Sequence, residues 1–128
     1  MKLMYSYICL FSALTLIVCM NSCGKKTDTT DYAAIAVCSG TTPTYTADIA
    51  NILNTNCATS ACHSASSAKS GINLSTYSSA SSQFKTNSKN LISIHHGSGV
   101  DQMPKNAAKL SEATINKLDC WVKNGCPQ

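Results

Sequence analysis

Residues 57–63 read Cys-Ala-Thr-Ser-Ala-Cys-His, and this stretch governs how the rest of the 128-residue chain is interpreted. Two thiols stand five positions apart, and an imidazole follows the second thiol directly. Cysteine and histidine in such an arrangement attach or ligate a metal-containing group, or else the cysteines belong to a disulfide framework. The residues around the stretch distinguish these alternatives.

The first interpretation is covalent attachment of haem. The usual attachment signature has two residues between its cysteines and then a histidine, whereas four residues separate Cys57 and Cys62. The expanded form keeps the thiol beside the imidazole, and a slightly longer loop costs little closure entropy. We therefore predict thioether bonds from Cys57 and Cys62 to one haem, with His63 as an axial ligand of its iron. A disulfide pair and a zinc site, which needs a fourth ligand, are the alternatives.

A second iron ligand is predicted in the loop at 97–109, which is rich in Gly and Pro. Met103 precedes Pro104 there, a poor setting for a core side chain. A thioether opposite His raises the reduction potential and leaves no open coordination position. His95 is the rival ligand, although we favour a surface or hydrogen-bonding role for His95 and His96.

The N-terminus predicts export. Lys2 and the apolar residues 3–20 are typical of a secretory signal peptide, predicted over residues 1–22, and a retained anchor is the alternative. The context Met20-Asn21-Ser22-Cys23 resembles a bacterial lipoprotein cleavage site. Cys23 would then be lipidated and would anchor the chain to a membrane. An oxidising compartment beyond the inner membrane is implied.

The mature chain divides into a tether and one small domain. Residues 23–45 are polar, with a short apolar patch, and are predicted to form a lipidated flexible tether. Residues 46–128 are predicted to fold, with an apolar core that is marginal by itself. The net charge of +4 is weak and scattered, which argues against nucleic-acid binding. Paired carboxylates for acid–base catalysis are missing, so an enzyme is not predicted.

Four helices are predicted from apolar spacing and capping residues. The first has Asp48 in its first turn and delivers Cys57 at its C-terminal end. A turn at residues 71–74 is expected to lead into an extended pair. The predicted N-cap or starting residues of the helices are Thr46, Ser75, Ser88 and Ser111, and Gly125 ends the last helix.

The order of these elements resembles a class I c-type cytochrome domain. The shared features are a helix, Cys-x4-Cys-His, Gly-x-x-Leu-x-x-Tyr, Leu-x-x-Ile, Met-Pro and a final Ile-x-x-Leu-x-x-Trp-Val-x-x-Gly. The chain is most similar to small cytochrome c-like lipoproteins of the Bacteroidetes type, over about residues 46–126. The resemblance implies an all-α fold in which crossed N- and C-terminal helices, two short helices and loops surround one haem c.

After the predicted lipidation site at Cys23, three further cysteines lie outside the attachment stretch: Cys38, Cys120 and Cys126. At most one disulfide can form among them. We favour Cys38 with Cys126 or Cys120, because that bond would close a long loop and fasten the tether to the domain. A bond between Cys120 and Cys126 is the rival.

The predicted function is one-electron transfer by a monohaem c-type cytochrome at the periplasmic or outer cell-envelope face. Redox partner proteins and a lipid-contacted membrane are the expected partners. Two alternatives belong to other classes. One is an open-site haem protein that handles peroxide or another ligand, and the other is a haem-free surface module held by disulfides or zinc.

Overall fold

The computed structural model describes residues 27–128, so the signal peptide and the lipidation predicted at Cys23 lie outside the described residues. Helices account for 46% of the interpretable part, which contains no strand, so the fold is all-α as predicted. No strand follows the turn at residues 71–74, so the prediction of an extended pair there is wrong. The elements in chain order are α2 (Tyr32–Ile35), η1 (Tyr45–Ile49), α3 (Ala50–Asn56), η2 (Lys69–Gly71), α4 (Tyr77–Thr86), α5 (Lys89–Ile94) and α6 (Glu112–Lys123).

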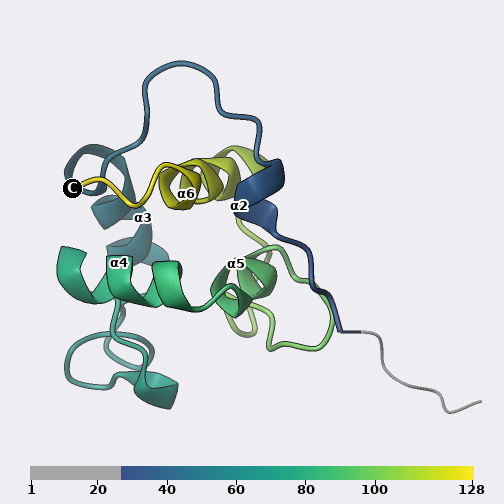
Figure 1. Cartoon of the computed structure of the whole chain (residues 1–128). Helices are drawn as coiled ribbons and strands as arrows, with labels where there is room; N and C mark the ends of the chain where they lie inside the picture. Colours follow the sequence, from purple (N-terminus) through teal and green to yellow (C-terminus); the bar gives the residue numbers. More distant parts are fainter. Residues whose placement is uncertain (1–26) are drawn as a thin grey trace, which may run out of the picture.

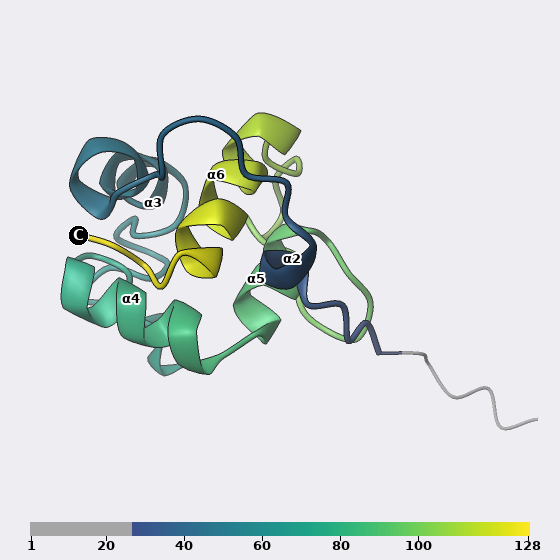
Figure 2. The ribbon, with the colours of Figure 1, turned by 45° about the horizontal axis from the view of Figure 1, so that its top comes forward.

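Helix α6 lies at the centre of the molecule, between α3, α4 and α5 (Figures 1 and 2). Its Trp121 and Leu118 are fully buried, as the predicted apolar face requires. The Trp121 ring meets Phe84 of α4 edge to face, with ring centroids 5.7 Å apart. The Trp121 indole N–H is also satisfied, because it donates to the Pro127 carbonyl over 2.8 Å. One buried aromatic thus joins α6, α4 and the C-terminal segment.

The first helical segment begins earlier than predicted. Thr44, not Thr46, is the N-cap, and its hydroxyl accepts the Ala47 N–H over 3.3 Å. Asp48 returns the interaction by accepting the Thr44 N–H over 3.2 Å. The same carboxylate binds Lys117 of α6 over 2.9 Å. Two reciprocal bonds therefore select Thr44 over a threonine two positions later.

The other helix boundaries follow the sequence closely. Thr76 caps α4, one residue beyond the predicted Ser75, and α4 buries Ala80, Ser81 and Phe84 as expected. Ser88 precedes α5, and Ser111 caps α6 by accepting the Thr114 N–H over 3.2 Å. Residues 97–109 form the predicted loop.

Residues 27–38 lie against the helical domain, and we call this segment the strap. It contains α2, which packs on α5 and α6 (Figure 1). A disulfide joins Cys38 to Cys120 of α6, which is one of the two favoured pairings. The rival Cys120–Cys126 bond is wrong, and Cys126 is a fully buried free thiol. Among the described residues, no helix is both long and apolar enough to cross a membrane.

Candidate functional site

The Cys57–His63 loop is closed on itself by backbone hydrogen bonds. Cys57 is the C-cap of α3 and its N–H donates to the Leu53 carbonyl over 2.8 Å. The His63 N–H donates to the Cys57 carbonyl over 3.0 Å. The four residues between the thiols therefore form a compact turn that returns His63 to the end of α3. The backbones of the first cysteine and the histidine are therefore held together despite the expanded spacing.

The His63 ring is oriented by the chain that follows it. Its Nδ1 lies 3.2 Å from the Ile72 carbonyl. A carbonyl can only accept, so Nδ1 carries the proton and the neutral ring keeps its lone pair on Nε2. The His63 carbonyl accepts the Leu74 N–H over 2.8 Å, which fixes the same two segments together. A hydrogen bond from one ring nitrogen to a backbone carbonyl is typical of a histidine that binds a metal through its other nitrogen.

Both thiols of the loop are free and half-buried. Burial raises the pKa of the Cys57 thiol from 9.0 to about 11, and the neighbouring Cys62 adds to the rise. Cys57 also packs against the apolar core. The haem-free chain therefore holds Cys57 as a neutral thiol at physiological pH.

We expect iodoacetamide to alkylate Cys57 slowly in the folded, haem-free chain. The pKa of about 11 in place of 9.0 leaves about a hundredfold less thiolate at pH 7 than in the chain unfolded by urea. The folded-state rate should then rise about tenfold per pH unit until the pH nears that pKa. Peptide mapping by mass spectrometry measures the rate, with Cys57→Ser as the control for peptide assignment. Equal rates in folded and unfolded chains at pH 7 would contradict the burial of this thiol.

Met103 lies on a second loop, and its backbone is held on both sides. The Met103 N–H donates to the Ser93 carbonyl over 2.9 Å. His96 Nε2 lies 3.1 Å from the Met103 carbonyl, so this nitrogen carries a proton and donates. The Met103–Pro104 peptide bond is cis, and the Met103 side chain is half-buried. In Figure 1 the connection between α3 and α4, which carries His63, lies beneath α4, whereas the loop between α5 and α6, which carries Met103, lies beside α5.

His95 lies between helix α6 and the strap. Its Nε2 donates to Asp119 of α6, with the nearer carboxylate oxygen 2.9 Å away. The Tyr32 ring of the strap stacks on the imidazole, with centroids 3.6 Å apart and planes 12° from parallel. Burial raises the pKa of the Asp119 carboxyl, and the hydrogen bond from His95 opposes that rise. The structure thus engages His95 in packing between the strap and α6.

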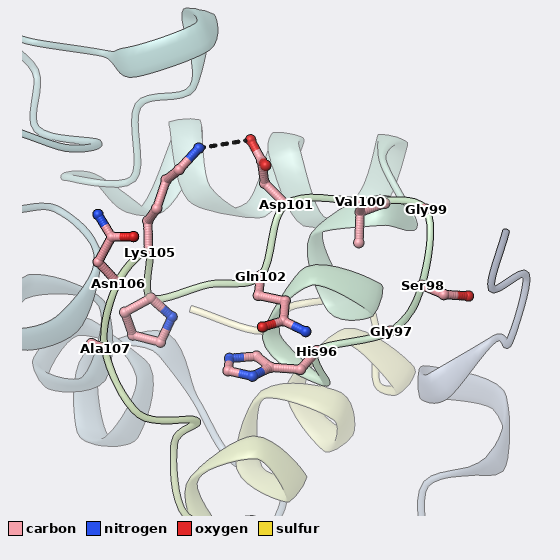
Figure 3. A pocket seen from close by; sticks show the side chains of 11 residues that line it. His96, Gly97, Ser98, Gly99, Val100, Asp101, Gln102, Lys105, Asn106 and Ala107 are labelled. Carbon is pink, nitrogen blue, oxygen red and sulfur yellow. Dashed lines mark hydrogen bonds and ion pairs between the residues drawn. The ribbon is translucent and has the colours of Figure 1, made fainter. Parts of the chain in front are cut away.

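A cavity of about 560 Å³ opens on the Met103 loop (Figure 3). The His96 and Gln102 side chains lie close together in it, and an exposed Lys105–Asp101 ion pair of 3.1 Å spans one edge. Its volume is in the range of small-molecule sites. Neither His63 nor Met103 lines it, so this cavity does not unite the two predicted axial ligands.

The predicted site residues are therefore brought together in part. One loop gathers both thiols and the imidazole, and Met103 comes from a separate loop. Within residues 27–128, no three His, Cys, Asp or Glu side chains are grouped so as to hold a metal ion. A zinc site needs four such ligands, so the zinc alternative gains no support from this part of the chain.

Compared with known proteins, the chain matches no family model, no curated protein and no solved structure. The fold and the site define a class by themselves. Over residues 27–128 it is a small all-α domain with one disulfide, in which a half-buried loop after α3 carries two free thiols and an oriented imidazole.

The sequence analysis did not identify three groups that contact the histidines His63 and His95. The Ile72 carbonyl orients His63, Asp119 binds His95, and Tyr32 covers His95. Only Asp119 leaves a local signal, because it is a carboxylate next to the buried Cys120 and Trp121 on the final helix.

Proposed function

We propose that the chain is a monohaem c-type cytochrome that carries one electron between redox partner proteins. The observation that carries the proposal is the His63 imidazole, whose Nδ1 faces the Ile72 carbonyl at 3.2 Å beside two free thiols. An imidazole held in this tautomer has its Nε2 lone pair ready for iron. The resemblance of the sequence's element order to class I cytochromes supports the same proposal.

The chain's own groups fit a covalent haem. Cys57 and Cys62 would supply the thioether links, His63 one axial ligand, and Met103 the other. When bound, the haem supplies an iron that alternates between ferrous and ferric states. The polypeptide contributes a neutral, soft thioether opposite His, which favours the ferrous state and raises the potential. Two backbone bonds, from Met103 to Ser93 and from His96 to Met103, hold the methionine in place.

The setting is an exported lipoprotein, anchored through Cys23 at the periplasmic or outer cell-envelope face. The Cys38–Cys120 disulfide supports export, because such bonds persist in oxidising compartments. Two acyl chains at Cys23 would anchor the domain stably.

The decisive experiment is an intact mass of the full chain exported from cells that contain a haem-attachment system. We expect the mass of one haem plus acyl chains, and a reduced-minus-oxidised spectrum with sharp c-type bands. The Cys57→Ser, Cys62→Ser double variant should lose the haem mass, whereas Cys126→Ala, which removes a thiol elsewhere, should keep it. Colourless wild-type protein without added haem mass would refute the cytochrome and leave the haem-free module.

A further inference from the structure

One end of the strap is seated on the loop that carries Met103. The Asp28 N–H donates to the Ser98 carbonyl over 2.8 Å. A methyl group built on Gly97 would collide with the Asp28 carboxylate, and one on Gly99 would lie 2.7 Å from the Thr27 side chain. Two glycines thus let the strap approach the loop backbone closely. A side chain at either position would displace one segment from the other.

The middle of the strap is held by Tyr32. Its hydroxyl donates to Asp28 over 2.7 Å, which fixes the seated end. Its ring stacks on His95, the residue that ends α5 and opens the loop. His95 in turn donates to the buried Asp119 of α6. Tyr32 therefore lies between the strap's contact with the loop and the central helix α6.

The other end of the strap is fastened to α6. Lys123 Nζ donates to the Ala36 carbonyl over 2.7 Å and to the Ala34 carbonyl over 3.2 Å. The Asn116 side-chain amide donates to the Val37 carbonyl over 3.2 Å, and the Cys38–Cys120 disulfide follows at once. The strap is therefore fixed to α6 at this end and to the loop at the other.

The contact between the strap and the loop is linked to Met103 through a few hydrogen bonds. His96 adjoins His95 in sequence and donates to the Met103 carbonyl over 3.1 Å. Ser93, on α5, accepts the Met103 N–H, and Ile92 accepts the Gly97 N–H over 2.8 Å. Both ends of the segment 96–103 are therefore tied to the end of α5, where Tyr32 packs. A shift of this helix end would move the methionine.

We propose that the strap positions the Met103 loop, with Tyr32 as the positioning residue that holds loop and helix α5 against α6. The inference rests on the proposed function in one respect, because the loop's purpose there is to present Met103 to iron. The strap would then be part of the ligand-presenting machinery and not only a connection to the membrane anchor.

The first test needs no haem and uses hydrogen exchange of the full haem-free chain. In Tyr32→Ala, we expect the amides of Gly97 and Met103 to exchange on the order of tenfold faster than in the wild type, because local opening becomes easier. Tyr32→Phe keeps the stacked ring but loses the bond to Asp28, so its exchange rates should lie between those of the wild type and Tyr32→Ala. Gly97→Ala approaches the same contact from the loop and should also accelerate the Met103 amide.

Phe84→Leu is the matched control, since it loosens the core at α4 without touching the strap. It should lower the melting temperature. The amides of Gly97 and Met103 should then exchange no faster, compared with other protected amides of the same variant, than they do in the wild type. If Tyr32→Ala gives the same pattern as Phe84→Leu, Tyr32 only stabilises the fold and the inference is wrong.

The second test uses haem-loaded protein and measures the rate at which carbon monoxide binds the ferrous form. Because Met103 must leave before carbon monoxide enters, Tyr32→Ala should bind on the order of tenfold faster. Tyr32→Phe, which loses only the bond to Asp28, should bind at a rate between those of the wild type and Tyr32→Ala. If haem-loaded wild type and variants all bind carbon monoxide at the same rate, the role proposed for the strap is wrong, while the proposed function is unaffected. Protein that never acquires haem would overturn the proposed function, while hydrogen exchange would still decide the role of the strap.

Discussion

Met103→Ala is expected to turn a haem-loaded protein that resists carbon monoxide into one that binds it readily. If the thioether occupies its iron position about 99% of the time, removing it raises the apparent affinity about a hundredfold. Met103 has no substitute, because the other three methionines, Met1, Met4 and Met20, all lie in the predicted signal peptide. The difference spectrum of the ferrous protein with and without carbon monoxide measures the change.

Gln102→Ala is the control for this experiment. Gln102 is the exposed neighbour of Met103, so its removal alters the loop surface without removing the thioether. It should leave the protein insensitive to carbon monoxide. Wild-type protein that already binds carbon monoxide as tightly as Met103→Ala would contradict the assignment of Met103 and would favour the open-site haem protein.

The Cys38→Ser, Cys120→Ser double variant is expected to lose much of the domain's stability. The bond joins residues 82 positions apart, and the chain-entropy model assigns about 4.5 kcal/mol to a loop of that length. For a domain of this size, the melting temperature should fall by about 20 °C. Changing both residues leaves neither Cys38 nor Cys120 as an unpaired thiol that could form a new disulfide with Cys126. Thermal unfolding followed by circular dichroism measures the difference.

A reductant supplies the matched comparison. Wild-type protein treated with a dithiol should fall to the melting temperature of the double variant, which the same treatment should leave unchanged. Equal melting temperatures for untreated wild type and variant would contradict a stabilising role for the bond. Peptide mapping of the non-reduced protein should recover Cys38 linked to Cys120.

Local patterns predicted most of the secondary structure. Apolar spacing on the last helix predicts a face of Ile115, Leu118 and Val122 with Trp121 beside it. Ile115, Leu118 and Trp121 are buried, whereas Val122 is half-buried, and Ser111 and Gly125 mark the ends of the helix. These signals work because a helix is set by residues within one or two turns of each other. Thr46 was chosen over Thr44 because capping depends on which hydroxyl meets a free N–H. Here the Asp48 side chain, held by Lys117 from α6, settles that choice.

Part of the candidate site was equally local. The Cys57–His63 loop is contiguous, so its thiols and imidazole had to lie near one another whatever the fold. The orientation of the His63 ring was not accessible in this way, because its partner is the Ile72 carbonyl, nine residues further along. Every residue type has a backbone carbonyl, so the sequence does not indicate which carbonyl will accept a hydrogen bond from a histidine ring.

The sequence by itself determined an all-α domain, the helix that delivers Cys57, and the set of three cysteines from which one disulfide could form. Only the tertiary structure decided that Cys38 pairs with Cys120, that the strap packs on the Met103 loop, and that His95 lies between Tyr32 and Asp119. The physical reason is range. Helix signals act across a few residues, whereas these contacts join residues from 24 to 82 positions apart, whose meeting depends on how all the helices pack together.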